Sequence, residues 1–224
     1  MSDATWRANN QTVAEFESVG FDDSAWPYAV SVDSPPWGLL PSPPPSNSTL
    51  SLASSYWIWN NQVPPGSPTS TAPVGSFAFR KTYQVPGGSL VDSGTIVIDV
   101  DDEYTLYING NEIGSGNSFT KAQRWTFSLQ PSTNNIVLAI NATNGGGPAG
   151  LIAAVAFHAT TVGCSTNLVK VTDGTPDGTW KFNLGVPAGF EQPGYDDSNW
   201  GSTIVEGPYG VTPWGSVPVV DGSK

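Results

Sequence analysis

The chain has 224 residues, enough to bury a substantial core in one large domain or in two small ones. Only 12% of the residues are charged, and 19 acidic residues against 8 basic residues give a formal net charge of −11. That balance repels nucleic-acid phosphates and anionic lipid, and no apolar run approaches the ~20 residues of a membrane-spanning helix, so nucleic-acid binding and membrane insertion are both disfavoured.

The first ten residues lack a basic segment followed by an apolar run, so no signal peptide is visible in the sequence. Glycosylation sequons nevertheless begin at Asn10, Asn47 and Asn141. These triplets favour a secreted, extracellular glycoprotein, and a cytoplasmic protein is the alternative.

A pattern in the N-terminal segment returns near the C-terminus. "TW…GFDDSAW…PPWG" over residues 5–38 is repeated as "TW…GYDDSNW…TPWG" over 179–215, and 20 positions separate the first two tryptophans of each copy. The Asp-Asp-Ser step is typical of a turn that holds a packed tryptophan. We therefore divide the chain into an N-terminal flank (1–55), a central strand-rich module (56–165) and a C-terminal flank (166–224). The last is expected to pack on the same domain, and the alternative is that it opens a second module.

Short apolar segments bounded by turn residues follow the N-terminal flank. The chain contains 25 glycines and 20 prolines, and helical periodicity is nearly absent. The Asn-Gly pair at 109–110 predicts a two-residue hairpin, because both central residues of a type I′ turn need a positive φ. We predict an all-β fold, an antiparallel β-sandwich or jelly roll, with strands at 76–85, 94–100, 104–108, 124–129, 135–143 and 150–159.

An acidic cluster follows the strand predicted at 94–100. Alternation places the isoleucines of this strand on one face and puts Asp99 and Asp101 on the other. Clustered carboxylates repel one another and lose hydration when buried, so they usually lie beside a positive partner. Calcium, which takes several hard oxygen ligands, is one such partner, and a solvated strand end is the alternative. Asp99 and Glu103 are expected to be solvated.

Aromatic residues are abundant, with nine tryptophans, seven tyrosines and nine phenylalanines. Sugars have apolar C–H faces that stack on such rings. Trp125 is preceded by polar residues and is the best candidate for an exposed stacking ring, whereas Trp57 and Trp59 are expected to pack. Packing in the core is the alternative for any single tryptophan.

A glycine-rich loop connects the last two predicted strands. Three consecutive glycines before Pro148 would let backbone carbonyls and Asn144 approach a ligand or an ion closely. The alternative is a flexible hairpin tip. In an antiparallel sheet this loop and the Asp101–Asp102 corner would lie at the same rim.

No catalytic set is evident. Glycoside hydrolysis needs two carboxylates about 5–10 Å apart across a bond, which adjacent pairs such as Asp22-Asp23 and Asp196-Asp197 do not by themselves provide. The single histidine, His158, lies in a strand-like run, and the single cysteine, Cys164, has no base near it in sequence. We interpret both as structural residues and predict that the chain is not an enzyme.

The order of motifs from Tyr56 to Thr160 resembles a known family. "YWIWNN", "FAFRKTYQV", "IDVDDEYTLYINGNEIGSG", "RWTFSLQ" and "NATNGGGPAGLIAAVAF" follow one another as in the galactose-binding-like β-jelly rolls associated with α-L-rhamnosidases. These are carbohydrate-binding module family 67 and the related mushroom lectins. In that family sugar binding depends on a calcium ion at the rim of the jelly roll, and rhamnose is the reference ligand.

The resemblance also implies roles for individual residues. By position, it assigns calcium to Asp101, Asp102, Asn144 and the carbonyl of Pro148, and sugar binding to Trp125, Asp101, Asp102 and Asn144. The family has an Asp-Asn pair where this chain has two aspartates, which makes the site more negative. No counterpart of the catalytic helical barrel of rhamnosidases is found in the sequence, so the resemblance implies binding rather than hydrolysis.

The sequence therefore predicts a calcium-dependent lectin for rhamnose- or galactose-type glycans. A shallow site of this kind binds a monosaccharide weakly, so a homo-oligomer would be one source of avidity. A glycoside hydrolase or its ancillary fragment is one alternative. A structural or adhesive surface protein with a decayed sugar site is another.

Overall fold

The computed structural model describes residues 22, 24–26, 50–85, 89–161, 164–171 and 180–222. The chain separates into two compact units, residues 1–48 and 49–224. In the first unit the amide of Ser24 donates a 2.9 Å hydrogen bond to the carboxylate of Asp22, as expected of a turn. The sequons at Asn10 and Asn47 lie outside the described residues.

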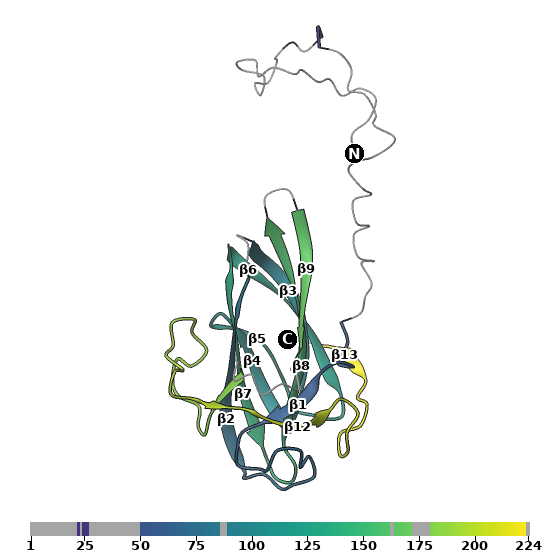
Figure 1. Ribbon diagram of the computed structural model, residues 1–224, viewed down its shortest axis with the longest axis vertical. Helices are drawn as coiled ribbons and strands as arrows, with labels where there is room; N and C mark the ends of the chain where they lie inside the picture. Colours follow the sequence, from purple (N-terminus) through teal and green to yellow (C-terminus); the bar gives the residue numbers. More distant parts are fainter. Residues whose placement is uncertain are drawn as a thin grey trace. The chain divides into compact units, whose positions relative to one another are not determined.

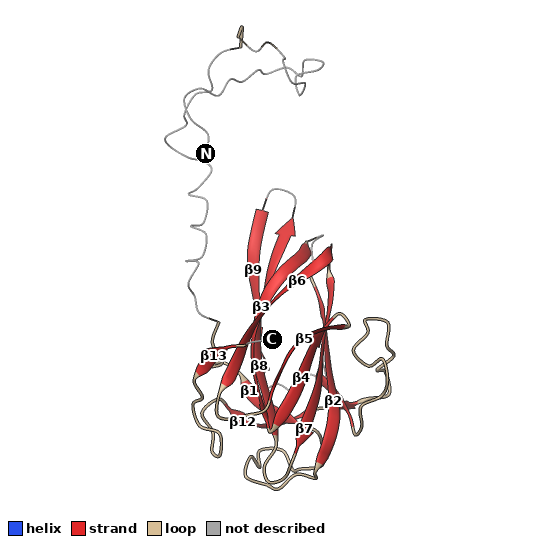
Figure 2. Ribbon diagram, turned by 180° about the vertical axis from the view of Figure 1, so that it is seen from behind, coloured by secondary structure: helices blue, strands red, loops and turns tan. Residues whose placement is uncertain are grey.

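The unit from 49 to 224 is a β-sandwich of two sheets (Figure 1). The described residues contain strands and no helix, and hence no helix that is long and apolar enough to cross a membrane (Figure 2). The prediction of an all-β sandwich is confirmed. The strands predicted from the sequence correspond to β2, β3, β4, β6, β7 and β8, with bounds as follows, and only Val85 at the end of the first predicted strand lies outside its strand.

The six-stranded sheet consists, in spatial order, of β11 (Gly201–Ser202), β10 (Trp180–Asn183), β2 (Gly75–Gln84), β7 (Asn135–Asn144), β4 (Glu103–Ile108) and β5 (Asn111–Gly116). The seven-stranded sheet consists of β12 (Ile204–Pro208), β1 (Tyr56–Trp59), β8 (Gly150–Thr161), β3 (Leu90–Asp101), β6 (Ala122–Thr133) and β13 (Val219–Asp221), and β9 (Cys164–Val171) pairs with β8. The pairing is antiparallel except for β13, which runs parallel to β6.

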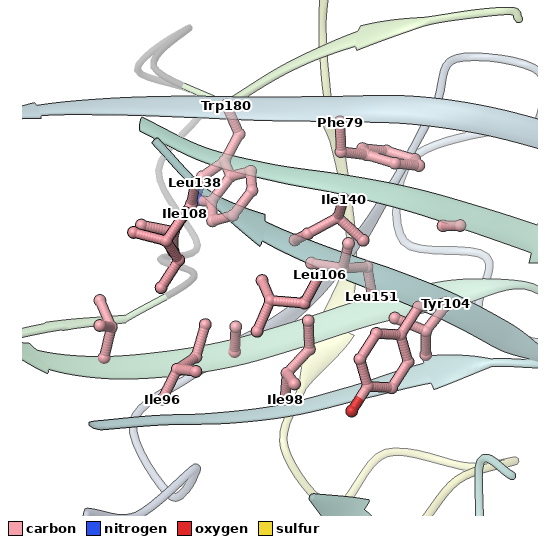
Figure 3. Close-up of a cluster of buried hydrophobic side chains, with 14 of the residues drawn as sticks. Phe79, Ile96, Ile98, Tyr104, Leu106, Ile108, Leu138, Ile140, Leu151 and Trp180 are labelled. Carbon is pink, nitrogen blue, oxygen red and sulfur yellow. The ribbon is translucent and has the colours of Figure 1, made fainter. Parts of the chain in front are cut away.

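The main core lies between the two sheets. Alternate residues of each strand point inward, and Figure 3 shows Ile96 and Ile98 of β3 facing Leu106 and Ile140 of the other sheet. Trp59 is also buried there against Phe77 and Phe79, so the expectation that this tryptophan packs is confirmed. This alternation decides which residues of each strand remain for the outer faces, where the site is built.

The hairpin predicted at Asn109-Gly110 is confirmed. β4 ends at Ile108 and β5 begins at Asn111, and both loop residues have positive φ, 47° for Asn109 and 83° for Gly110. The side chain of Asn109 also accepts a 2.7 Å hydrogen bond from the amide of Val137, which ties the hairpin to β7.

The C-terminal segment, residues 180–222, contributes strands to both sheets. It adds β10 and β11 to the six-stranded sheet, and β12 and β13 to the edges of the seven-stranded sheet. Trp214 stacks on the buried Trp57, with ring centroids 4.2 Å apart, and thereby covers part of the outer face of the seven-stranded sheet. On the six-stranded sheet, residues 184–200 cover half of the outer face, where Phe190 packs on Ala78, Val137 and Ala139.

Two chain crossings between the sheets meet at one end of the sandwich. The chain passes from β3 to β4 at Asp101–Asp102, and it returns from β7 to β8 through residues 145–149. Asp101 pairs with Gly150, and the amide of Asp102 donates a 2.9 Å hydrogen bond to the carbonyl of Thr143. The expected common rim of the acidic corner and the glycine-rich loop is therefore present.

Candidate functional site

The rim joins the acidic corner directly to the glycine-rich loop. Asp102 directly precedes β4 of the six-stranded sheet. Its carboxylate accepts a 2.7 Å hydrogen bond from the amide of Gly145. This contact requires a close approach of the backbone, and a Cβ added at Gly145 would lie only 3.1 Å from the same carboxylate. The loop is thus folded around Asp102 and is more than a free hairpin tip.

Asp101 lies behind Asp102 and is only 5% exposed. Its carboxylate accepts a 2.9 Å hydrogen bond from the indole nitrogen of Trp214. Burial raises the pKa of Asp101 to about 7, and the adjacent carboxyl of Asp102 adds to this effect, whereas the Trp214 hydrogen bond opposes it. The peptide bond between the two aspartates is cis. The carboxyl groups of Asp101 and Asp102 interact with each other, and neither forms an ion pair with a basic side chain among the described residues.

The expectation that Asp99 is solvated is wrong. Asp99 is 0% exposed, and burial raises its pKa to about 8, with a further contribution from the charge of Asp101. As predicted, Asp99 lies on the face of β3 that points away from the main core. The C-terminal segment, however, covers part of that outer face of the sheet. Glu103, in contrast, is exposed as expected.

Asn144 and Pro148 complete the predicted set from the other side of the rim. The side-chain amide of Asn144 is buried and donates 3.0 Å hydrogen bonds to the carbonyls of Ala72 and Pro73. These bonds fix its oxygen, which accepts a 3.0 Å hydrogen bond from Gly146 in the loop. Pro148 is half-buried, four residues further along the same loop.

A cavity of about 490 Å³ opens at this rim. Oxygen-bearing side chains dominate its lining, and the loop glycines leave space at one wall. The lining residues are Asp102, Glu103, Asn117, Thr143, Gly145 and Gly146. In the described part of the chain, no group of three or more His, Cys, Asp or Glu side chains could hold a metal by itself, so a cation at the rim would also need amide and backbone oxygens.

The expectation that Trp125 is exposed is wrong. This residue of β6 is 5% exposed, and its indole nitrogen donates a 2.9 Å hydrogen bond to the hydroxyl of Tyr104 inside the sandwich. Its ring lies so close to Gly114 and Gly222 that a Cβ at either glycine would be about 2.5 Å from ring atoms. β5 of the opposite sheet and the chain at Gly222 close over the ring, so it offers no free face for stacking.

The repeated Asp-Asp-Ser segments are turns in both copies. In the C-terminal copy the amide of Ser198 donates a 2.9 Å hydrogen bond to Asp196, which matches the bond between Ser24 and Asp22. Asp197 forms ion pairs with Arg80 at 2.9 Å and with Lys181 at 3.0 Å. The structural interpretation of Asp22, Asp196 and Asp197 is supported, because their oxygens bind the protein itself, whereas Asp23 lies outside the described residues.

His158 is a strand residue, as predicted. It lies in β8, and its Nδ1 is 3.0 Å from the carboxylate of Asp92, which also accepts a hydrogen bond from Ser93. A Ser-His-Asp triad needs the histidine between the serine and the acid, whereas here the acid lies between the other two. Cys164 is the first residue of β9, and the structure describes its backbone but not its side chain.

Sequence reasoning missed the partner of Asp101 and two of the six residues that line the cavity. Trp214 stood out only as part of the repeated Pro-Trp-Gly motif, and that repeat was the one available signal. Asn117 carries no motif, and Thr143 belongs to the sequon at Asn141, which does not indicate a place at the rim. Both residues reach the cavity through the pairing of β4, β5 and β7.

Known structures share this architecture. A lectin from Pleurotus ostreatus, solved in complex with GalNAc, is 36% identical with a TM-score of 0.67, and the match covers 99% of this chain and 62% of the lectin. Its apo form is 37% identical with the same TM-score. The sandwich has the galactose-binding-like β fold.

The same fold occurs within a much longer enzyme. The α-L-rhamnosidase of Streptomyces avermitilis is 29% identical over 189 residues, which are 81% of this chain and 17% of the enzyme. Its structure in complex with L-rhamnose has a TM-score of 0.60. No family model matches the chain. The chain thus spans less than two thirds of the lectin and about a sixth of the rhamnosidase, and the galactose-binding-like sandwich is what they have in common.

Proposed function

We propose that this sandwich is a lectin that binds carbohydrate in the rim cavity without hydrolysing it. The observation that carries the proposal is the cavity itself, where the acidic corner and the glycine-rich loop form a polar, accessible wall. Sugar hydroxyls are recognised by such carboxylate, amide and hydroxyl groups in directional hydrogen bonds. The likeness to a lectin solved with GalNAc and to a rhamnosidase solved with L-rhamnose supports galactose- or rhamnose-type ligands.

We also propose that a calcium ion contributes to this site. Its ligands would be Asp101, Asp102, Asn144 and the carbonyl of Pro148. The donor set fits, because all four groups supply hard oxygens and the two carboxyls lie together without a basic partner among the described residues. Bound calcium would offer coordination positions to vicinal hydroxyls of a sugar.

The proposal of binding without hydrolysis rests on the carboxyls that the rim offers. Asp101 is buried beneath Trp214, so the cavity is lined by Asp102 and Glu103, which are neighbours at the start of one strand. A hydrolase requires two carboxylates facing one another across the bond to be cleaved. We expect no turnover of an aryl rhamnoside or an aryl galactoside, which a release assay checks.

Calorimetry with L-rhamnose, galactose and N-acetylgalactosamine, with and without a chelator, tests both parts of the proposal. We expect at least one sugar to bind and the chelator to lower its affinity by about tenfold or more, because the sugar hydroxyls lose their coordination to the ion. Asp101→Ala and Asp102→Ala should have the same effect. Asp102→Asn keeps an oxygen at the rim and should retain sugar binding with a lower calcium affinity.

Glu112→Ala is the matched control, because Glu112 is an exposed acid of β5 outside the cavity and its removal changes the net charge equally. This variant should bind as the wild type does. Binding that survives both chelation and Asp101→Ala would overturn the calcium proposal alone. Binding of none of these sugars would count against the lectin proposal as a whole.

A further inference from the structure

A second cavity of about 550 Å³ adjoins the rim cavity. The two cavities share the lining residues Glu103, Asn117 and Thr143, so they lie next to each other, and together they are called the groove. From the rim the groove extends over the outer face of β4, β5 and β7, next to the half of this sheet that residues 184–200 cover. The rim cavity is therefore one end of a longer polar groove.

The floor of the groove consists of two polar rows across the sheet. In the row next to the rim, Glu103 of β4 pairs with Thr143 of β7. In the second row, Thr105 pairs with Asn141 on one side and with Ser115 on the other. Two residues along a strand advance about 7 Å, so the second row lies roughly one pyranose unit beyond the first.

The next row closes the groove. Tyr107 pairs with Ala139 and packs edge-on against Phe190 of the covering segment, with ring centroids 5.8 Å apart. The open part of the sheet face thus contains the rim row and one further row, and then ends at an aromatic wall.

The second row is polar without serving the fold. The side chains of Thr105 and Ser115 form no hydrogen bond with any other described group, and the same is true of Asn117 and Glu103 beside them. Asn141 also lines the groove, but its side-chain oxygen is buried without a partner. On the covered half of the same face, in contrast, Arg80 and Lys181 both bind Asp197. A row of small polar side chains with free bonding capacity is typical of a ligand surface.

We infer that the second row binds a second sugar unit, so that the groove holds a neutral oligosaccharide of at least two units with one of them in the rim cavity. This inference rests on the proposed function of the rim. No lysine or arginine lines either cavity, while Asp102 lines the rim cavity and Glu103 lines both. Neutral glycans are therefore favoured over sialylated or sulfated ones.

The test compares monosaccharides with disaccharides on the full chain by calorimetry. L-Rhamnose, galactose and N-acetylgalactosamine are each compared with disaccharides that carry the same sugar at either end. We expect at least one disaccharide to bind about three- to tenfold more tightly than its monosaccharide. A gain in affinity of this size corresponds to one or two additional hydrogen bonds. Thr105→Val and Asn141→Ala should each reduce that gain to less than twofold and leave the monosaccharide affinity unchanged.

Thr82→Val is the matched control, because Thr82 is an exposed residue of β2 outside both cavities. It should preserve the full gain. The inference is overturned if no disaccharide exceeds its monosaccharide, or if the gain survives both Thr105→Val and Asn141→Ala. These results leave the lectin proposal standing, since the monosaccharide still binds. If the wild type bound none of these sugars, both the lectin proposal and the inference of a second sugar unit would be overturned.

Discussion

Buried carboxyl groups are the least expected single residues of this protein. Asp99, Asp101 and Glu206 are each at most 5% exposed, although carboxylates lose favourable hydration when buried. Asp101 lies at the rim, where we propose a cation, and Asp99 lies two residues before it in β3. Glu206 lies away from the rim in β12, and burial raises its pKa to about 7, with the backbone of Ser67 opposing the shift. Glu206 therefore gives the clearest test of how much folding stability a buried carboxyl group costs this protein.

We predict that Glu206→Gln stabilises the protein at pH 8 and has little effect at pH 4.5. The folded state binds the proton of Glu206 more tightly than the unfolded state, whose pKa is near 4.5. The wild type therefore loses stability as the pH rises from about 4.5 to about 7, and the full cost remains above that range. We expect a gain on the order of 2 kcal/mol at pH 8, measured by urea unfolding.

Glu112→Gln provides the control for that prediction, since it removes an exposed acid and should shift stability by less than about 0.5 kcal/mol at either pH. An equal effect of Glu206→Gln at pH 4.5 and pH 8 would mean that the charge of Glu206 is not what costs stability.

At the scale of elements, a glycine at position 114 lets β5 pack closely against the core. Gly114 leaves room for the ring of Trp125, which belongs to the other sheet, and a Cβ there would lie 2.4 Å from the ring. The hairpin that contains β5 therefore closes one side of the sandwich at a position where a larger side chain does not fit. The same contact buries the tryptophan and removes it from the rim.

We predict that Gly114→Ala destabilises the protein by about 1–3 kcal/mol, because the added methyl group must displace a buried indole. Thermal unfolding measures the loss, and near-ultraviolet circular dichroism reports the displaced tryptophan. Gly194→Ala is the control, because a Cβ there meets nothing within 4 Å. Stability equal to the wild type in Gly114→Ala would show that β5 is not held as tightly as the structure indicates.

For the sandwich as a whole, the C-terminal segment is part of the fold. Trp180 and Phe182 lie in the main core, while Trp214 and Val217 cover the outer face of the seven-stranded sheet. Burying one such side chain contributes roughly 1.5–3 kcal/mol. The four together are comparable with the ~5–15 kcal/mol that separates folded from unfolded domains.

We therefore predict that a chain ending at residue 179 does not fold cooperatively at 25 °C, because it loses β10 to β13 and exposes Trp57. Thermal unfolding followed by circular dichroism is the measurement. Trp214→Ala should remain folded and lose about 3–5 kcal/mol, the cost of one large buried side chain. A cooperative transition near the wild-type midpoint in the shortened chain would contradict this account.

The sequence by itself determined the strands, the hairpin and the meeting of the two rim segments. These features follow from local rules: apolar residues alternate along a strand, and Asn109-Gly110 can adopt positive φ. The position of Asp101 and Asp102 at the end of β3 also follows, because the strand's inward and outward faces are already set by its isoleucines.

Only the tertiary structure decided which rim residues face solvent. Asp99 and Asp101 point to an outer face, but Trp214 from more than 100 positions away covers part of it. Trp125 follows polar residues in sequence, yet Gly114 and Gly222 allow two distant segments to close over its ring. Alternation assigns a side chain to a face, whereas burial depends on what other segments lie against that face, and no local pattern encodes those segments.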